Sequence, residues 1–270
     1  MLLNLEGNNK NININGAMNV FPVKSGNPVV KTFPNGLYFQ NDLFAKAPKK
    51  SVVTQNVTVP FNNQYSPKQL LNAYNNENYL NFLINSNPEL KKFLSENGID
   101  GKVYTNHVSS MVNTHLTSTS AIALQLANKM NISASDKKIL EQACVFHDFG
   151  KVLIPPEIVN KPSGLTSEEK RIMDLHAELG YQLLSNTGMN QKTLNLIRNH
   201  HKPQELNNDV LGQILSVADI YSALREQRSY KTALSDADTL KILDQKAKNG
   251  EVSAEVVNTL KSIVNCAKVA

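Results

Sequence analysis

Histidine and aspartate side chains in the middle of the chain have the types and positions that could hold a metal ion. His147 and Asp148 are adjacent, His200 and His201 are adjacent, and Asp219 interrupts an apolar run. Burying an ionised carboxylate is costly unless a cation accompanies it. Imidazole and carboxylate together suit iron, manganese or zinc. A single histidine on a helix is most often a packed core residue, but this combination favours a metal site.

Helices must bring these side chains together. Neighbouring residues on an α-helix point about 100° apart, so His147 and Asp148 can face one centre only at a helix end. Gly150 is the residue type that ends helices. Lys151 follows Asp148 by three residues and returns to the same side, where its ammonium could bind a phosphate.

The chain after residue 65 has the apolar spacing of helices. Apolar residues recur at intervals of three and four, and Thr166 with Glu169 has the spacing of a capping box. No long alternating strand pattern appears, so the body is predicted to be all-α. After a first helix from Ser66, the expected helices cover residues 87–97, 103–130, 135–149, 167–185, 190–201, 209–225, 235–248 and 253–267.

Residues 1–65 differ in composition from the body. Eight of the first thirty residues are asparagine, and five prolines occur by residue 60. Such a segment is predicted to be an irregular, Asn-rich extension, and it is the candidate docking segment for a protein partner. Residues 66–106 are predicted to form a helical lead-in to the body.

The net charge of +5 does not indicate a nucleic-acid-binding surface. Residues 1–60 contain six lysines and two acidic residues, which leaves a net charge of +1 for the remainder. A groove that follows a phosphate backbone needs cations clustered on the folded body. No nucleic-acid partner is therefore expected.

Composition also excludes several other classes. No apolar run approaches the roughly 20 residues that span a bilayer, and the first residues lack the pattern of a signal peptide. The two cysteines, Cys144 and Cys266, lie far apart in sequence, which fits a reducing compartment. We therefore expect a cytoplasmic protein without a membrane partner.

The stretch HDFGKVLIPPEIVNKPSGLTSEEKRIMDLHAELGYQLL, residues 147–184, resembles the HD-GYP family, a branch of the HD-domain metal-dependent phosphohydrolases. NHH at 199–201, SVADIYSAL at 216–224 and QRSYKTA at 227–233 follow in the order of the family's motifs. The resemblance covers residues 107–234. It implies an HD-domain helical bundle with extra C-terminal helices, over residues 107–270.

The resemblance also implies a pair of metal ions, iron or manganese, although zinc fits the same ligand types. One ion would be held by four side chains, with Asp148 bridging to a second ion held by three histidines, and a hydroxide between the ions would attack phosphorus in line. The implied ligands are His115, His147, Asp148 and Asp219 for one ion, and His176, His200 and His201 for the other. Asp148 and Lys151 would be catalytic, and Lys151, Arg228 and Lys231 would contact substrate phosphates.

Two departures from the family pattern sharpen these expectations. Met111 stands where some members have a glutamate that serves a third metal, so two metals are expected. The Asp-Gly-x-Gly-Tyr-Pro segment that names the family is absent after His201, and residues 202–208 lead almost directly into the next helix. Because this loop helps to shape the cyclic dinucleotide pocket, the sequence supports the metal site more strongly than the substrate.

The leading hypothesis is a metal-dependent phosphodiesterase that hydrolyses a cyclic dinucleotide of the cyclic di-GMP type. One alternative is an HD phosphohydrolase that acts on another nucleotide. The other is a catalytically silent HD-type signalling or binding module. Retention of all seven implied ligands counts against the silent module, because a scaffold has no need of buried histidines and aspartates at these positions.

Overall fold

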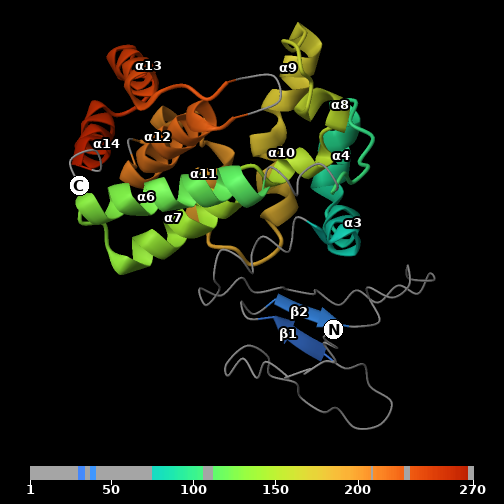
Figure 1. The fold of residues 1–270 in the computed structure, drawn as a ribbon. Helices are drawn as coiled ribbons and strands as arrows, with labels where there is room; N and C mark the ends of the chain where they lie inside the picture. The colour runs from blue at the N-terminus through green and yellow to red at the C-terminus, as the bar shows by residue number, and fades with distance from the viewer. Residues whose placement is uncertain are drawn as a thin grey trace, which may run out of the picture.

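The computed structural model describes residues 30–33, 37–40, 75–105, 112–207, 209–227 and 232–266. From residue 75 onward the described segments are helical, so the predicted all-α body is confirmed (Figure 1). None of the described helices is both long and apolar enough to cross a membrane. The helices are α3 (Glu77–Asn85), α4 (Pro88–Glu96), α6 (Thr117–Lys129), α7 (Ala134–Phe146), α8 (Pro156–Val159), α9 (Ser167–Asp174), α10 (His176–Leu184), α11 (Gln191–Arg198), α12 (Val210–Arg225), α13 (Asp236–Lys248) and α14 (Ala254–Cys266).

The N-terminal segment, predicted to be irregular, contains one short regular element. Strand β1 (Val30–Phe33) pairs antiparallel with β2 (Leu37–Gln40), with Val30 opposite Gln40. The sequence between the strands ends in Asn35-Gly36, a pair typical of hairpin turns, which the sequence analysis did not use. The predicted helix start at Ser66 and the boundary at residue 65 lie outside the described residues.

Local capping chemistry sets several helix starts. The predicted capping box is present: the Glu169 amide donates to Thr166 Oγ1 at 3.2 Å, and Glu169 Oε2 accepts from the Thr166 amide at 2.7 Å. Asn87 caps α4 in the same way, followed by Pro88 at the first helical position, where a missing N–H costs nothing. These helix starts therefore follow from side chains adjacent in sequence.

Several predicted helices extend beyond the observed ones or run across a break in them. Residues 101–105 are not helical, and the Tyr104 amide donates instead to the carbonyl of Val152 at 2.8 Å. A π-helical turn (Val112–Leu116) precedes α6, and α7 ends at Phe146 rather than Phe149. The predicted helix over residues 167–185 divides into α9 and α10 on either side of Leu175. Periodicity cannot detect such breaks, because the apolar spacing continues across them.

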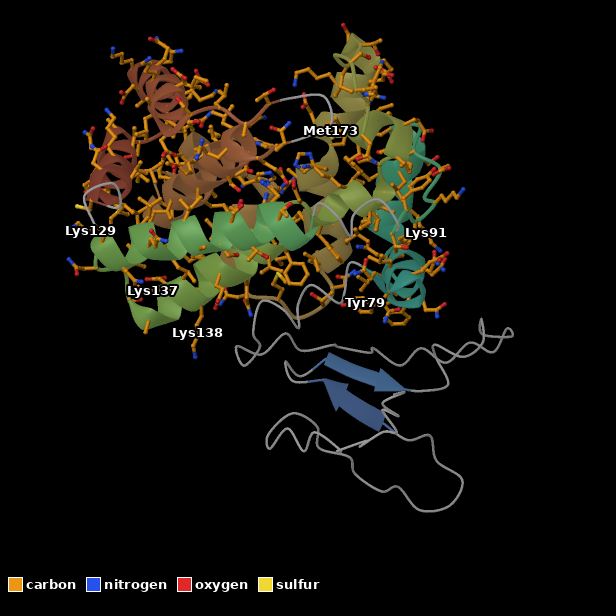
Figure 2. The ribbon with its side chains drawn as sticks, in the orientation of Figure 1. Tyr79, Lys91, Lys129, Lys137, Lys138 and Met173 are labelled. Atoms are coloured by element: carbon orange, nitrogen blue, oxygen red, sulfur yellow. The ribbon has the colours of Figure 1, made fainter. Side chains whose placement is uncertain are left out.

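Helices α6 and α7 form an antiparallel pair, against which α11 and α12 pack (Figure 1). Lys129, Lys137 and Lys138 lie at the end of this pair where α6 is joined to α7 (Figure 2). The interior is apolar and closely filled, with Leu126 of α6, Phe146 of α7 and Leu215 of α12 all fully buried. Burial of large apolar side chains is the main favourable term holding such a bundle together.

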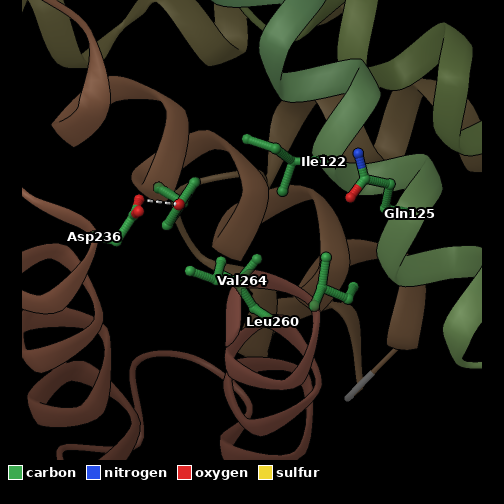
Figure 3. Close-up of a pocket in the computed structure, with 7 residues that line it drawn as sticks. Ile122, Gln125, Asp236, Leu260 and Val264 are labelled. Atoms are coloured by element: carbon green, nitrogen blue, oxygen red, sulfur yellow. Dashed lines mark hydrogen bonds between the residues drawn. The ribbon is translucent and has the colours of Figure 1, made fainter. Parts of the chain in front are cut away.

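Helices α13 and α14 pack on one side of α12, away from α3 and α4 (Figure 1). A small pocket of about 290 Å³ lies among α6, α12 and α14, lined by Ile122, Gln125 and Leu260. At its edge the Tyr221 hydroxyl donates to Asp236 Oδ1 at 2.6 Å, which ties α12 to the start of α13 (Figure 3).

Candidate metal centre

The seven predicted ligands come from five places in the fold and meet inside the helical body. His115 lies on the π-helical turn before α6, His147 and Asp148 follow α7, and His176 begins α10. His200 and His201 follow α11, and Asp219 lies within α12. Six of the seven are buried, and His201 is the exposed member.

Gly150 allows the His147-Asp148 segment to approach α10. After Asp148 the chain forms a 3₁₀ turn (Phe149–Leu153) that packs on α10. A Cβ atom at Gly150 would lie 2.0 Å from the carbonyl oxygen of His176 and 2.5 Å from the amide nitrogen of Gly180. Only a residue without a side chain fits between these backbones. This contact places Asp148 beside His176.

Three of the histidines are oriented by the same local contact. In each, ring Nδ1 lies within hydrogen-bond distance of the backbone carbonyl three residues earlier, as for His176 and Met173. Figure 2 labels Met173. A carbonyl only accepts, so Nδ1 must carry the proton and Nε2 keeps a free lone pair. The pairs are His147 with Cys144 at 2.8 Å, His176 with Met173 at 2.7 Å and His200 with Ile197 at 2.7 Å.

The free lone pairs then face one another. His176 Nε2 lies 3.2 Å from His200 Nε2 and 3.1 Å from His201 Nε2. His147 Nε2 is fully buried and has no hydrogen-bond partner among the described residues. Converging lone pairs repel, and a buried polar atom without a partner is costly, unless a cation lies among them. The donor set therefore fits a divalent metal.

Two aspartates complete the arrangement. Asp219 Oδ1 lies 3.0 Å from His115 Nε2 and 3.5 Å from His147 Nε2. Asp148 faces both sides: Oδ1 lies 3.3 Å from His176 Nε2, and Oδ2 lies 3.6 Å from His147 Nε2. Three overlapping groups of three potential ligands result. His115, His147 and Asp219 form one and His176, His200 and His201 another, and the third, His147, Asp148 and His200, places Asp148 between the first two.

The electrostatics favour neutral histidines and ionised aspartates. Burial, helped by the Lys151 ammonium, lowers the pKa of His176 to about 3, and burial also holds the pKa of His200 well below its usual range. For Asp148, burial raises the pKa, but Lys151 and the histidines outweigh it and hold the pKa well below normal. Neutral imidazole and ionised carboxylate are the forms that bind metals.

His147 behaves differently from these histidines. Burial lowers its pKa, but the charges of Asp148 and Asp219 outweigh burial and raise the pKa above its usual value. A proton and a metal ion would therefore compete for the same Nε2 atom.

Lys151 lies on the same side as Asp148, as the spacing predicts. Its Nζ donates to Asp148 Oδ2 at 2.7 Å, and its side chain is 14% exposed. The other two predicted phosphate contacts, Arg228 and Lys231, lie outside the described residues, as does Met111.

Sequence reasoning missed several side chains around the cluster. Ser118 and Ser222 contact His115, and Arg198 pairs with Glu178 at 2.6 Å beside a cleft of about 780 Å³ that His201 also lines. The signal available for Ser222 was its spacing of three residues after Asp219, which places both on one face of a helix.

The fold and the site together define an all-α domain with a histidine- and aspartate-lined centre suited to divalent cations. Residues 112–224, which contain all seven predicted ligands, match the family described as "HD domain". For this part of the chain, the match confirms the resemblance stated from the sequence. An HD domain implies divalent metal binding, which the ligand clusters fit.

Several proteins with assigned activities are similar to this chain. RpfG, a cyclic di-GMP phosphodiesterase response regulator from Xanthomonas campestris, is 32% identical over 42% of this chain and 33% of its own length. A 3'3'-cGAMP-specific phosphodiesterase from Vibrio cholerae is 32% identical over 42% of this chain and 24% of its own. A cyclic di-GMP phosphodiesterase from Thermotoga maritima is 32% identical over 40% and 32%.

The aligned part spans a third or less of the length of these three relatives. Among solved structures, an HDG"Y"P protein from Bdellovibrio bacteriovorus aligns with a TM-score of 0.49 and 19% identity, over 74% of this chain and 65% of its own.

Proposed function

We propose that the HD domain is a metal-dependent phosphodiesterase that hydrolyses a cyclic dinucleotide of the cyclic di-GMP type. The observation that carries the proposal is the arrangement of two ligand triads on either side of Asp148, with ring lone pairs turned inward. The three relatives are named as phosphodiesterases of cyclic di-GMP or 3'3'-cGAMP, which supports the choice of substrate class.

The proposed cofactor is a pair of divalent ions, iron or manganese, with zinc also compatible with the ligand types. His115, His147 and Asp219 would hold one ion, His176, His200 and His201 the other, and Asp148 would bridge them. Bound there, the ions would activate water and neutralise charge on the phosphate.

Lys151 is proposed to bind the substrate phosphate. Its ammonium has three donors, of which one is engaged by Asp148 at 2.7 Å, and part of the side chain reaches the surface. An ammonium fixed beside the bridging carboxylate is positioned to donate to a nonbridging phosphate oxygen as negative charge develops there. Arg228 and Lys231 remain proposed contacts to the substrate phosphates.

The cleft beside His201 offers room for a substrate larger than a single phosphodiester. Its volume of about 780 Å³ lies within the usual range for ligand pockets. Its lining cations Lys170 and Arg198 are each paired with an acidic residue, Asp174 and Glu178 respectively. Such a mixed lining suits a nucleotide, which has polar edges as well as charge.

The test is to load the protein with Mn²⁺ or Fe²⁺ under anaerobic conditions and to incubate it with cyclic di-GMP, 3'3'-cGAMP, cyclic di-AMP and bis(p-nitrophenyl) phosphate. We expect about two metal equivalents and linear dinucleotide or mononucleotide products. Hydrolysis of a nucleotide other than a cyclic dinucleotide would favour the alternative of an HD phosphohydrolase with another substrate. Metal binding without turnover of any substrate would favour the catalytically silent module.

A Lys151→Ala variant tests the assignment of the phosphate contact. Because Lys151 is placed on the substrate, metal content should stay at the wild-type value while kcat/KM falls roughly a hundredfold. Metal analysis and steady-state kinetics measure both quantities. Loss of the metals in this variant would contradict the assignment, since Lys151 would then act through Asp148. Lys241→Ala, which removes an exposed lysine of α13 paired with Asp238, is the control.

A further inference from the structure

The contact that orients His115 differs from the one that orients the other buried histidines. His147, His176 and His200 each place Nδ1 against a carbonyl of their own helix. His115 Nδ1 instead lies 3.3 Å from the hydroxyl of Ser222, which is only 3% exposed and belongs to α12. Ser222 follows Asp219 by three residues on this helix, so one helix face supplies a carboxylate and a hydroxyl to the two ring nitrogens of His115.

Three kinds of contact join His115, Ser118 and Ser222: one between the two serine hydroxyls, one from a hydroxyl to the His115 carbonyl, and one between Ser222 Oγ and His115 Nδ1. The first two kinds use up the hydroxyl protons. The Ser222 hydroxyl contacts the Ser118 hydroxyl, and both hydroxyls lie near the His115 carbonyl oxygen, at 3.0 Å for Ser118 and 3.3 Å for Ser222. Each hydroxyl has one proton. One proton fills the serine–serine contact and the other is donated to the carbonyl.

The third contact, between Ser222 Oγ and His115 Nδ1, then needs its proton from the histidine. Whichever serine donates to the carbonyl, the Ser222 proton is already committed, so Ser222 must accept from Nδ1–H. The tautomer that results has a free lone pair on Nε2, which lies 3.0 Å from Asp219 Oδ1. This is the tautomer a metal ligand requires.

A nearby carboxylate acts in the same direction. Glu226 Oε2 lies 3.9 Å from His115 Nδ1, and Glu226 Oε1 accepts a hydrogen bond from Thr114 at 2.7 Å, which holds the group in place. Negative charge near Nδ1 favours the proton on that nitrogen.

We propose that Ser222 is a positioning residue that selects the Nδ1–H tautomer of His115 and so presents Nε2 to the metal. The inference rests on the proposed metal centre. Without the Ser222 hydroxyl, the proton can move to Nε2, where it would be donated to Asp219 Oδ1. That hydrogen bond would occupy two predicted ligands of one ion at once.

The affinity test uses Zn²⁺ alone as the probe, in competition with a chromophoric chelator, on the full chain. Ser222→Ala should weaken one of the bound zinc equivalents by roughly ten- to a hundredfold, as for other outer partners of metal-binding histidines. Ser118→Ala should have a smaller effect, because Ser222 still reaches the carbonyl of His115. Ser216→Ala, an equally buried serine on the same helix, should leave zinc affinity unchanged.

A spectroscopic test uses the wild-type protein, so it does not depend on the folding of any variant. Nitrogen-15 NMR of the metal-free protein should show His115 with its proton on Nδ1, before any zinc at Nε2 could impose that tautomer. A proton on Nε2, or unchanged zinc affinity in a folded Ser222→Ala variant, would overturn the proposal. If the wild-type protein bound no zinc, the metal centre itself would be wrong, and the proposed function would fail with it.

Discussion

The polar groups on the two sides of α12 differ in whether they satisfy one another's hydrogen bonds. On one side, Asp219 Oδ1 faces the Nε2 lone pairs of His115 and His147, so among the described residues acceptors face acceptors. On the other side, Tyr221 donates to Asp236, which also pairs with Arg225 Nε at 2.9 Å, so donors and acceptors match. A network in which donors and acceptors match links helices to one another. A cluster in which acceptors face acceptors instead needs a cation as a ligand.

The largest expected effect on metal binding comes from removing the carboxylate between the two triads. We expect Asp148→Ala to lose at least one metal equivalent and to lower phosphodiesterase activity by more than a hundredfold, the upper range for outer partners of metal ligands. Metal analysis and a turnover assay measure the two effects. Asp238→Ala, which removes an exposed aspartate of α13, is the control. Unchanged metal content and activity would remove Asp148 from the site.

The close approach of Gly150 to α10 provides the largest expected effect on stability. In Gly150→Ala the new methyl group would collide with backbone atoms of His176 and Gly180, which cannot move independently. We expect a loss of about 3 kcal/mol in the free energy of unfolding, measured by urea denaturation. Gly164→Ala is the matched control, because its Cβ would meet nothing within 4 Å. Equal stability of the two variants would contradict this packing.

Metal binding should stabilise the triads without involving the Tyr221 network. At a free metal concentration of a hundred times Kd, one bound ion adds about 2.7 kcal/mol to the free energy of unfolding, because it binds only the folded state. Thermal unfolding of chelator-treated protein, with and without Mn²⁺, measures the shift in Tm. The shift should be smaller in Asp148→Ala, which loses at least one metal equivalent, and should keep its full size in Tyr221→Phe. No shift in the wild-type protein would argue against a preformed site.

The smallest effect on stability is expected from the hydrogen bond between Tyr221 and Asp236. Tyr221→Phe removes the hydroxyl that donates to Asp236 at 2.6 Å, and should cost about 1 kcal/mol of stability. Metal affinity should not change, since Tyr221 is absent from both ligand triads. Tyr181→Phe, whose ring packs under Arg198, is the control. A loss of metal affinity in Tyr221→Phe would show that the two sides of α12 are coupled.

Sequence reasoning predicted the elements that depend on near neighbours. The Thr166–Glu169 capping box and the all-α body are confirmed, because caps and apolar periodicity involve residues within about one helical turn. The break between α9 and α10 was missed, although it determines where His176 points. Directly after this break, α10 packs against Gly150, a contact between segments about 30 residues apart.

The metal ligands could be named from motif spacing, whereas their orientation could not. The sequence contains seven histidines and aspartates in the order of a known family, and this fixed the kind of chemistry to expect. It could not reveal which ring nitrogen each histidine turns inward, because that depends on carbonyls and hydroxyls placed by folding. Ser222 illustrates this, since its contact joins residues 107 positions apart.

By itself, the sequence determined the residue types at the site, the helical body and the family that residues 112–224 match. Only the tertiary structure decided that Asp148 lies between two triads, that Nε2 atoms converge, and that Lys151 is held by Asp148. The physical reason is that the chemistry of a residue is a property of its own side chain, whereas metal binding requires several side chains within a few ångströms of one another. That proximity arises only when the core packs and sets the distances between helices.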